Sequence, residues 1–399
     1  MGQVMAHANI LMLPFAAWLI VAALAPIGVW IFLNQLGEEF EQRAPSPVAL
    51  IIPVRGVPPQ LGDLWTGLLA QTYRPWRLIF TIESADDPAH AALSQVLHDH
   101  ERGPPAEIVI AGVGSDTGQK VWNLVAALKV LRDTDTIVVF ADADIAPTSD
   151  WLESIVEALP ESGIAMVSGY RWLMPKDRKL STELICTMNA SIATMPRTPL
   201  MNLAWGGTMA VRRETLEAIA IERVWRGSVL DDLPLSRAIQ DHGGLVLCPV
   251  RLMVPSPVSY DWRDGIAFVR RQYLLLRLYE PFHWMLAAAA TTIPTLGWIV
   301  ALPLALGGDR IAIAAIVGAS ILDHCRAALR RRVIRIRWGE AALERLARVL
   351  WLDRWATPVW LGFHTTMIWS TVLGRTIRWG GRVYRVDGRR SLSRLSGPL

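Results

Sequence analysis

The sequence predicts an α/β fold with a mostly parallel sheet, flanked by apolar helices toward both ends of the chain. Over residues 45–259, short apolar runs rich in β-branched residues alternate with stretches of helical spacing. Strands that alternate with helices imply right-handed crossovers and therefore parallel neighbours. Uncharged segments at residues 10–33 and 284–306 lie outside this region. Each is long enough to cross a hydrocarbon layer roughly 30 Å thick.

The elements of the α/β region follow in a regular order. Each expected strand is short, apolar and bounded by turn residues, and the strands lie at residues 49–52, 78–82, 106–110, 137–140, 164–168 and 209–211. Each expected helix has apolar residues at helical spacing, and the helices lie at residues 61–71, 89–98, 119–131, 183–195 and 235–240. Asp150 is expected to cap one more helix, which runs through Ile155.

Composition points to a lipid environment for part of the chain. Hydrophobic residues make up 52% of the 399 residues, and 18 tryptophans outnumber 6 tyrosines and 8 phenylalanines, as at membrane interfaces. The net charge is only +4, but arginines crowd the last quarter beside apolar segments. The sequence contains no nucleic-acid motif, so anionic lipid headgroups are the expected partner of these arginines. Cys186, Cys248 and Cys325 have no pairing or metal-ligand spacing and are expected to be reduced and buried.

Two carboxylates end the strand at residues 137–140. Asp142 and Asp144 are one residue apart, and Pro147 stops any extension of the strand. Ligands of open α/β sheets bind beyond the carboxyl ends of the strands. Two carboxylates in that place suit a hard divalent cation that keeps coordination sites open for a diphosphate. The alternative is a polar strand-to-helix turn without a ligand.

A second acidic turn, with Glu83, Asp86 and Asp87, follows the strand at residues 78–82. In a parallel sheet both acidic turns emerge at one edge, which favours a shared ligand site. Lys120 begins the helix after a loop of three glycines, where it can meet a phosphate with help from the helix dipole, or else be an exposed surface lysine.

Two further polar turns each allow a functional interpretation and a purely structural one. Asp231 and Asp232 open a helix, and they either act in the site or only complement the helix dipole. The two glycines of the turn Trp205-Gly206-Gly207 let the backbone come close to a ligand, or else mark a bend in the strand.

The apolar segments predict an integral membrane protein. Only uncharged residues precede the segment at 10–33, so it lacks the basic start of a signal peptide and is expected to stay as an anchor. Residues 260–277 interleave apolar side chains with arginines and predict a helix on the membrane surface. The segment at 311–322 is short and crosses only if tilted or extended. The basic residues 324–348 are expected on the cytoplasmic side, residues 357–373 in a re-entrant or interfacial segment, and the last ten residues in disorder.

These segments predict four domains. They are an anchor and linker at residues 1–44, a cytoplasmic catalytic domain at 45–259, an interfacial helix at 260–283, and a membrane region with basic loops and tail at 284–399. The expected location is a bacterial inner membrane.

An ordered set of motifs resembles the ceramide glucosyltransferases, a family of inverting, nucleotide-sugar-dependent enzymes of the GT-A type. The set comprises Arg55-Gly56-Val57, Asp86-Asp87-Pro88-Ala89, Lys120-Val-Trp-Asn123, Asp142-Ala-Asp144, Asp231-Asp232 and the run from Gly374 to Arg385. It extends from the first apolar segment to about Gly388. The family also has a Gln or Arg, two residues and then Arg-Trp on its interfacial helix, where this chain has Arg270-Arg271-Gln272-Tyr273.

The resemblance implies a role for each matching position. Asp87, with Glu83 nearby, holds the nucleotide, and Asp142 and Asp144 are the metal–diphosphate pair. Asp232 is the catalytic base. Tyr273 stands in for the family's Trp, and the basic position beside it is open between Arg270, Arg271 and Gln272. Lys120 and one of these residues would screen the diphosphate.

The expected reaction moves a hexose from a UDP-sugar to a lipid hydroxyl, with Mn²⁺ or Mg²⁺ and inversion at the anomeric carbon. A ceramide-like lipid is the first candidate acceptor, and a diacylglycerol or a hopanoid is an alternative. A polysaccharide acceptor is disfavoured because the crossings are too few for an export channel. A catalytically dead lipid-binding scaffold is disfavoured because four aspartates of the motifs are retained together. No obligate protein partner is evident.

Overall fold

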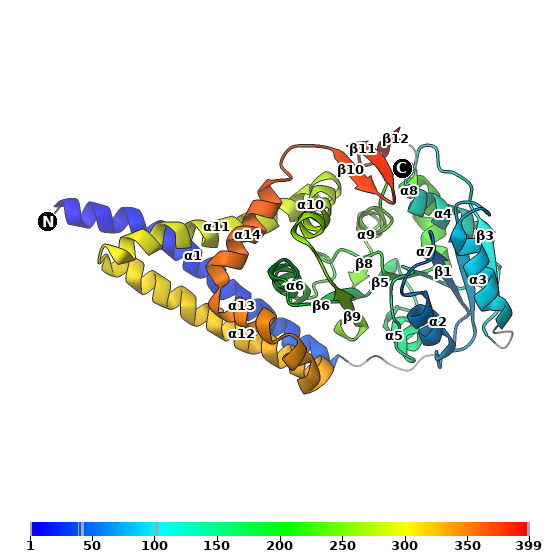
Figure 1. Ribbon diagram of the computed structural model, residues 1–399, viewed down its shortest axis with the longest axis horizontal. Helices are drawn as coiled ribbons and strands as arrows, with labels where there is room; N and C mark the ends of the chain where they lie inside the picture. Colours follow the sequence, from blue (N-terminus) through cyan, green and yellow to red (C-terminus); the bar gives the residue numbers. More distant parts are fainter. Residues whose placement is uncertain (1, 39, 41–43, 100–102, 397–399) are drawn as a thin grey trace. The chain divides into compact units, whose positions relative to one another are not determined.

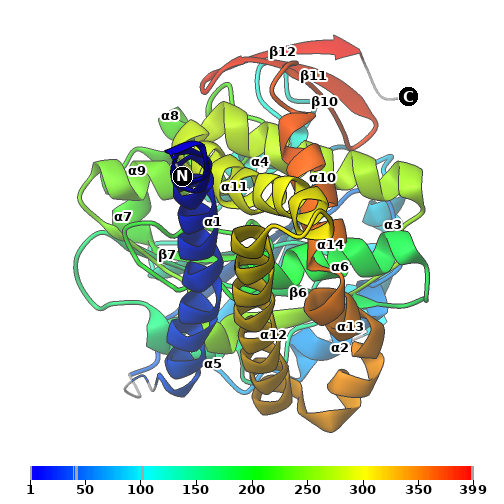
Figure 2. The same cartoon turned by 90° about the vertical axis from the view of Figure 1, so that its left-hand side faces the viewer.

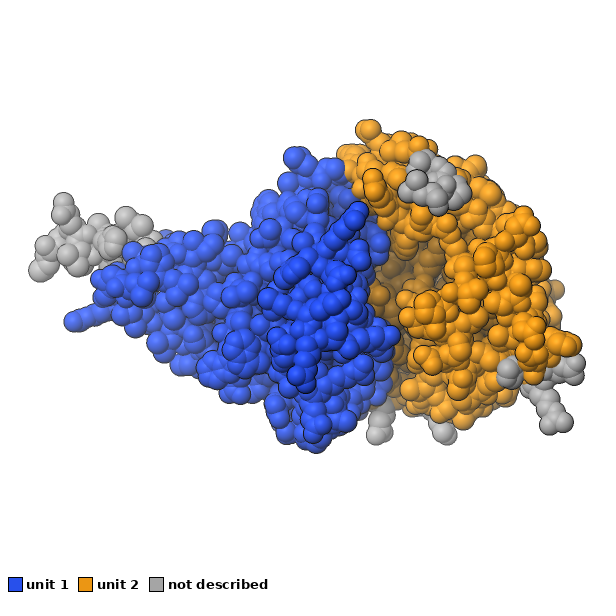
Figure 3. All heavy atoms as spheres, viewed as in Figure 1, with its two compact units in different colours: residues 1–37, 172–196, 255–374 blue, residues 38–171, 197–254, 375–399 orange. Residues whose placement is uncertain are grey.

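A computed structural model of the chain describes residues 2–38, 40, 44–99 and 103–396, with side chains for those between 12 and 395. The chain forms two compact units (Figure 3). The helical unit contains residues 1–37, 172–196 and 255–374, and the sheet unit contains residues 38–171, 197–254 and 375–399. These units interleave along the sequence, whereas the expected domains are consecutive. Linker residues 39 and 41–43 lie outside the described part.

The sheet unit is organised around a seven-stranded sheet (Figure 1). Its order is β3-β2-β1-β4-β7-β5-β8. Strand β7 is antiparallel to both β4 and β5, and the other pairings are parallel. The strands are β1 (Val48–Pro53), β2 (Trp76–Ile82), β3 (Ala106–Ile110), β4 (Ile137–Ala141), β5 (Ala165–Ser168), β7 (Thr208–Arg212) and β8 (Leu245–Leu247). The expected fold class, a mostly parallel α/β fold with long apolar helices, is confirmed.

Helices cover both faces of this sheet. They are α2 (Leu61–Leu69), α3 (Pro88–Asp99), α4 (Gln119–Leu128), α5 (Trp151–Ala158), α7 (Arg213–Ala218), α8 (Ile221–Trp225) and α9 (Asp232–Asp241). Alternate residues of β1 enter two separate apolar cores: Leu50 and Ile52 pack with residues of α2 and α5, and Ile51 packs with residues of α4 and α9. Burial on both faces explains why β1 is a continuous apolar run rather than an alternating one. Asp150 precedes α5 as expected, but its side chain makes no capping hydrogen bond.

The sheet topology brings the two acidic turns together. Strands β2 and β4 lie on either side of β1 and run parallel to it. The residues that follow β2 and the residues that follow β4 therefore leave the sheet at the same edge. This edge carries Glu83 and Asp87 from one loop and Asp142 and Asp144 from the other.

The end of the chain forms a second sheet in the same unit. Strands β10 (Thr376–Trp379), β11 (Arg382–Gly388) and β12 (Ser391–Ser396) pair antiparallel (Figure 1). The expectation of disorder over the last ten residues is therefore wrong for 391–396, because their backbone groups pair with β11. Residues 397–399 lie outside the described part of the chain.

The helical unit contains α1 (Gly2–Asn34), α6 (Leu180–Ala193), α10 (Trp262–Tyr279), α11 (Pro281–Leu306), α12 (Arg310–Arg345), α13 (Ala347–Trp355) and α14 (Thr357–Trp369). Helices α1 and α12 lie side by side in both cartoon views (Figures 1 and 2). Trp18 of α1 packs edge-on against Trp298 of α11, with ring centroids 5.1 Å apart. Gly297 makes this contact possible, since a Cβ there would lie 2.3 Å from the Trp18 ring.

Three helices of the described chain are long and apolar enough to cross a membrane. They span Met12–Gly37, Pro281–Leu306 and Arg310–Arg345. The third includes the short segment at 311–322 and also most of the basic stretch at 324–348, which is helical up to Arg345 with a kink at Gly339. Cys186 and Cys248 are buried, but Cys325 on this helix is exposed, which corrects the expectation of three buried thiols.

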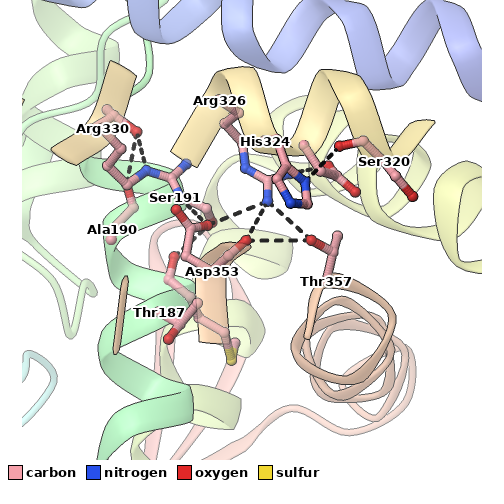
Figure 4. Close-up of polar contacts among 12 residues, drawn as sticks. Thr187, Ala190, Ser191, Ser320, His324, Arg326, Arg330, Asp353 and Thr357 are labelled. Carbon is pink, nitrogen blue, oxygen red and sulfur yellow. Dashed lines mark hydrogen bonds and ion pairs between the residues drawn. The ribbon is translucent and has the colours of Figure 1, made fainter. Parts of the chain in front are cut away.

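A buried ionic cluster lies inside the helical unit (Figure 4). Asp353 of α13 accepts a hydrogen bond from Arg330 and lies 3.4 Å from Arg326, both on α12. Arg326 also pairs with Asp323 and donates to the Thr357 hydroxyl at 3.1 Å. All five side chains are less than a tenth exposed. Buried charges of this kind are stable only when paired, so the cluster joins α12 and α13 in one arrangement.

The strands β6 (Tyr170–Pro175) and β9 (Met253–Val258) form a two-stranded sheet. Both strands begin in the sheet unit and end in the helical unit.

Candidate active site

A lysine held between two carboxylates is the centre of the site. The Nζ of Lys120 lies 2.7 Å from Oδ1 of Asp142 and 2.9 Å from Oδ2 of Asp231. The same Nζ donates to the backbone oxygen of Gly206 at 3.3 Å. Asp231 is almost fully buried, whereas a third of the Asp142 side chain is exposed. Four elements therefore meet at one ammonium group beyond the carboxyl end of β4.

The local structure explains how these residues meet. Lys120 is the second residue of α4, Asp142 follows β4 directly, and Asp231 precedes α9. Strand β7 pairs with β4, so the turn before β7 lies beside Asp142, whose backbone N–H donates to the Gly207 oxygen at 3.4 Å. A Cβ on Gly206 would lie 3.0 Å from the Lys120 Nζ and 3.1 Å from the Asp231 carboxylate. Glycine at this position is what allows the approach.

Burial and the neighbouring charges shift the pKa values of both Lys120 and Asp231. Burial by itself would lower the pKa of Lys120, but Asp142 and Asp231 hold it above its usual value, so the ammonium stays protonated. Burial raises the pKa of Asp231 despite the opposing charge of Lys120.

Asp232 lies beside this centre as the first residue of α9. Its Oδ2 accepts a hydrogen bond from the Gly206 N–H at 3.1 Å, and its Oδ1 accepts one from the Leu233 N–H at 2.7 Å. Burial, followed by the neighbouring charge of Asp231, raises the pKa of Asp232 to about 7. A carboxyl group with this pKa can accept a proton near neutral pH, which is what general-base catalysis requires.

Asp144 is the fourth aspartate of the cluster around Lys120. Although the side chain reaches solvent, surrounding protein atoms reduce its solvation and raise its pKa, and the like charge of Asp142 raises it further. The charge of Arg171 opposes this shift. The Arg171 guanidinium also lies 5.8 Å from the ring of Trp205, in the turn that contains Gly206. Sequence reasoning missed Arg171, because nothing in its local pattern distinguishes it from other arginines.

Within the described residues, no group of three or more His, Cys, Asp or Glu side chains forms a ready metal site. Four aspartates nevertheless surround a single lysine, so carboxylates are in excess there: Asp142, Asp144, Asp231 and Asp232. Oxygen ligands with an excess of negative charge are the donor set that Mg²⁺ and Mn²⁺ prefer.

The loop after β2 carries the other two predicted donor-binding residues. Oδ1 of Asp87 accepts hydrogen bonds from the N–H groups of Gly56, at 2.8 Å, and Ala89, at 2.9 Å. Asp87 thus ties the loop after β1 to the start of α3. Glu83 pairs with Arg382 of the C-terminal sheet. The sequence motif from Gly374 to Arg385 includes Arg382, but only the tertiary structure reveals its partner.

The three remaining predicted residues lie on α10 in the helical unit. Tyr273 is buried, and its hydroxyl hydrogen-bonds to the His364 ring of α14. Arg271 stacks over the Phe268 ring, with 5.7 Å from its guanidinium carbon to the centroid, and Gln272 is exposed. Their contact with the donor stays a prediction.

Comparison with known proteins identifies the family. Residues 11–392 match glycosyl transferase family 21. The chain belongs to this family. The resemblance inferred from the motifs is confirmed, and the protein is a nucleotide-sugar glycosyltransferase with a GT-A-like fold. No curated protein sequence matches the chain significantly.

Several solved structures are similar to the chain. The mannosyltransferase PcManGT from Pyrobaculum calidifontis, in complex with GDP-Man and Mn²⁺, is 16% identical with a TM-score of 0.47, and the match covers 90% of this chain and 96% of that one. TarS from S. aureus, in complex with UDP-GlcNAc, is 11% identical with a TM-score of 0.39, covering 88% and 99%. GalNAc-T7 with UDP, GalNAc and Mn²⁺ is 10% identical with a TM-score of 0.41, covering 64% and 54%.

Proposed function

We propose that the protein transfers a hexose from a UDP-sugar to the hydroxyl of a ceramide-like membrane lipid, with inversion at the anomeric carbon. Family membership supports glycosyl transfer. The observation that carries the rest is the Lys120 ammonium between two carboxylates, with Asp232 joined to the same Gly206 turn. This arrangement places a fixed positive charge next to a candidate base, as displacement of a diphosphate by a hydroxyl requires.

In this proposal the leaving diphosphate binds near Lys120. Breaking the bond from sugar to phosphate places negative charge on the diphosphate, and a fixed ammonium stabilises that charge more in the transition state than before it. Asp142 and Asp144 would hold a Mn²⁺ or Mg²⁺ ion, which supplies Lewis-acid stabilisation of the same charge when bound. Asp87 and Glu83, at the neighbouring strand ends, would orient the nucleotide.

Asp232 would take the proton of the acceptor hydroxyl. The ionised carboxylate accepts this proton while the oxygen attacks the anomeric carbon opposite the leaving group, so an α-linked donor gives a β-linked product. The turn with Trp205 would border the acceptor. The three long apolar helices would hold the protein at the membrane, where the lipid presents its headgroup without leaving the bilayer.

The test uses purified protein in vesicles with and without ceramide, supplied with UDP-glucose and Mn²⁺. Release of UDP that depends on ceramide, together with a glycosylated lipid found by mass spectrometry, is the expected result. A polymeric product would replace this function with polysaccharide synthesis. Absence of UDP release with every hexose donor and lipid tested would favour a scaffold without activity.

A matched pair of lysine variants sharpens the test. Lys120→Gln is expected to lower kcat by about 10²–10³-fold, in line with loss of one charge-stabilising group. Lys129→Gln changes an exposed residue at the end of the same helix and should leave kcat unchanged. Equal activity of the two variants would remove Lys120 from the mechanism.

A further inference from the structure

The C-terminal sheet contacts the same edge of the main sheet as the candidate active site. Its residues bond to the loop after β2 and to the first residue of α4. Glu83 and Arg382 are 299 positions apart in the sequence. Such a contact makes the last strands part of the surroundings of the donor site rather than a separate tail.

Arg382 is the residue that connects these parts. Its side chain is only 2% exposed. One terminal nitrogen of the guanidinium pairs with the carboxylate of Glu83, and the other donates to Oε1 of Gln119 at 2.9 Å. Glu83 follows β2 directly, and Gln119 is the first residue of α4. A single guanidinium therefore joins a strand end to a helix start.

Gln119 also hydrogen-bonds to the glycine loop before α4, and so connects Arg382 to that loop. Its Oε1 also accepts from the Gly114 N–H at 2.9 Å, and its Nε2 donates to the Gly112 oxygen and to Asn123 Oδ1, both at 2.8 Å. Its backbone N–H donates to the hydroxyl of Tyr384 in β11 at 3.4 Å. The residue after Gln119 is the lysine at the centre of the site. Displacement of Gln119 would consequently move both the loop and that lysine.

The turn between β10 and β11 adds a second connection. Gly380 and Gly381 have φ angles of 56° and 68°, which suit glycine in a tight hairpin. A Cβ on Gly380 would lie 2.8 Å from a terminal nitrogen of Arg55, so the turn contacts that guanidinium closely. Arg55 precedes Gly56, whose N–H bonds to Asp87. The C-terminal sheet thus contacts the loops after both β1 and β2.

We propose that Arg382 is a positioning residue for the donor site. It holds the carboxylate of Glu83 and the glycine loop before α4 in the arrangement that binds the donor nucleotide. It also neutralises Glu83, whose charge would otherwise repel a diphosphate at this edge. The inference rests on the proposed function, because the donor nucleotide is the ligand that the arrangement serves.

A role in stability alone does not explain why the charged guanidinium of Arg382 is buried here. Replacing a buried ion pair by apolar residues of similar volume is often neutral or stabilising. The Nε of Arg382 is also buried without a hydrogen-bond acceptor among the described residues. A guanidinium that is only partly satisfied contributes little net stability, whereas its two terminal nitrogens reach two separate loops of the site.

The experiment compares Arg382→Gln and Arg382→Lys with Arg378→Gln in the full-length protein in vesicles. Arg378 is exposed on the neighbouring strand and is the matched control. The measurements are KM for the UDP-sugar, KM for the lipid acceptor, and the dissociation constant of UDP. Arg382→Gln should raise KM for the donor and the UDP dissociation constant about tenfold and leave KM for the lipid unchanged. Arg382→Lys should give a smaller rise, because an ammonium can pair with Glu83 but not reach Gln119 as well.

Any of four results would overturn the proposal. One is that Arg382→Gln does not change KM for the donor. If the unsubstituted enzyme is active, this result rejects the role of Arg382 and leaves the proposed function intact. Another is an equal rise in the KM of both substrates, which indicates general loss of structure. If Arg382→Gln does not fold, a wild-type UDP dissociation constant in Arg382→Lys rejects the role. Absence of UDP binding by the wild-type protein would instead reject the proposed function, and this inference with it.

Discussion

Replacing Asp232 by asparagine tests the assignment of the base directly. The carboxylate accepts two backbone hydrogen bonds, one at each oxygen, from Gly206 and Leu233. Asparagine keeps the size of the side chain and one acceptor oxygen, but it cannot take a proton from the acceptor hydroxyl. We expect Asp232→Asn to abolish most of the transfer and to leave binding of the donor largely intact.

The expected magnitude follows from the chemistry and from the pKa. General-base catalysis is typically worth about 10²–10⁴-fold in rate, which is about 3–5 kcal/mol of activation free energy. Because the pKa of Asp232 is about 7, the ionised fraction falls about tenfold for each pH unit below it. The kcat/KM of the wild-type enzyme should therefore rise as the pH increases and level off above neutral pH. Asp232→Asn should lack this acidic limb.

The assay measures UDP release by the two proteins between pH 5 and pH 9, at saturating and at limiting donor. Asp241→Asn is the matched control, because Asp241 ends the same helix and is exposed. It should have wild-type rates and the wild-type pH profile. The reasoning is refuted if Asp232→Asn keeps kcat/KM within a few-fold of the wild type. It is also refuted if the slow variant still shows the acidic limb, since another group would then be titrating.

The remaining predictions concern the metal, the glycine turn and the buried ionic cluster. Chelation with EDTA should stop transfer and added Mn²⁺ should restore it, and Asp144→Asn should need more Mn²⁺ for half-maximal activity. Gly206→Ala should lower kcat by tenfold or more, because its Cβ would lie 3.0 Å from the Lys120 Nζ. Asp353→Asn should lower the free energy of unfolding in detergent by about 3–5 kcal/mol, because it leaves two buried arginines without their shared carboxylate. Glu340→Gln, at an exposed ion pair, should change it by less than about 0.5 kcal/mol.

Each of these predictions has a plain contrary result. Full activity in chelator would remove the metal from the mechanism. A Gly206→Ala enzyme with normal kcat would show that the turn can move away from the lysine without consequence. A small effect of Asp353→Asn, similar to that of Glu340→Gln, would show that water or other groups satisfy the cluster.

Local patterns predicted most of the sheet unit. The apolar run at 137–140 and its neighbours have the length and β-branched content of buried strands, and their alternation with helices implies parallel order. Parallel order, in turn, places Asp87 and Asp142 at one edge of the sheet. That step needs no tertiary information, because the carboxyl ends of parallel strands always lie together.

Other features could not be derived in this way. The exposed thiol of Cys325 and the helical conformation of residues 310–345, with its kink at Gly339, depend on which side chains pack around them. The order of the last strand also depends on its pairing with β11, which the polar composition of residues 391–396 does not reveal.

The sequence by itself determined the fold class and the family, and it predicted the acidic residues of the candidate site, because these depend on local periodicity and on residue type. Only the tertiary structure decided that Lys120 lies between Asp142 and Asp231, that Gly206 joins it to Asp232, and that Arg382 reaches Glu83. These contacts join segments far apart in the chain. They form only when the packed sheet and helices bring the segments together, so no local pattern contains them.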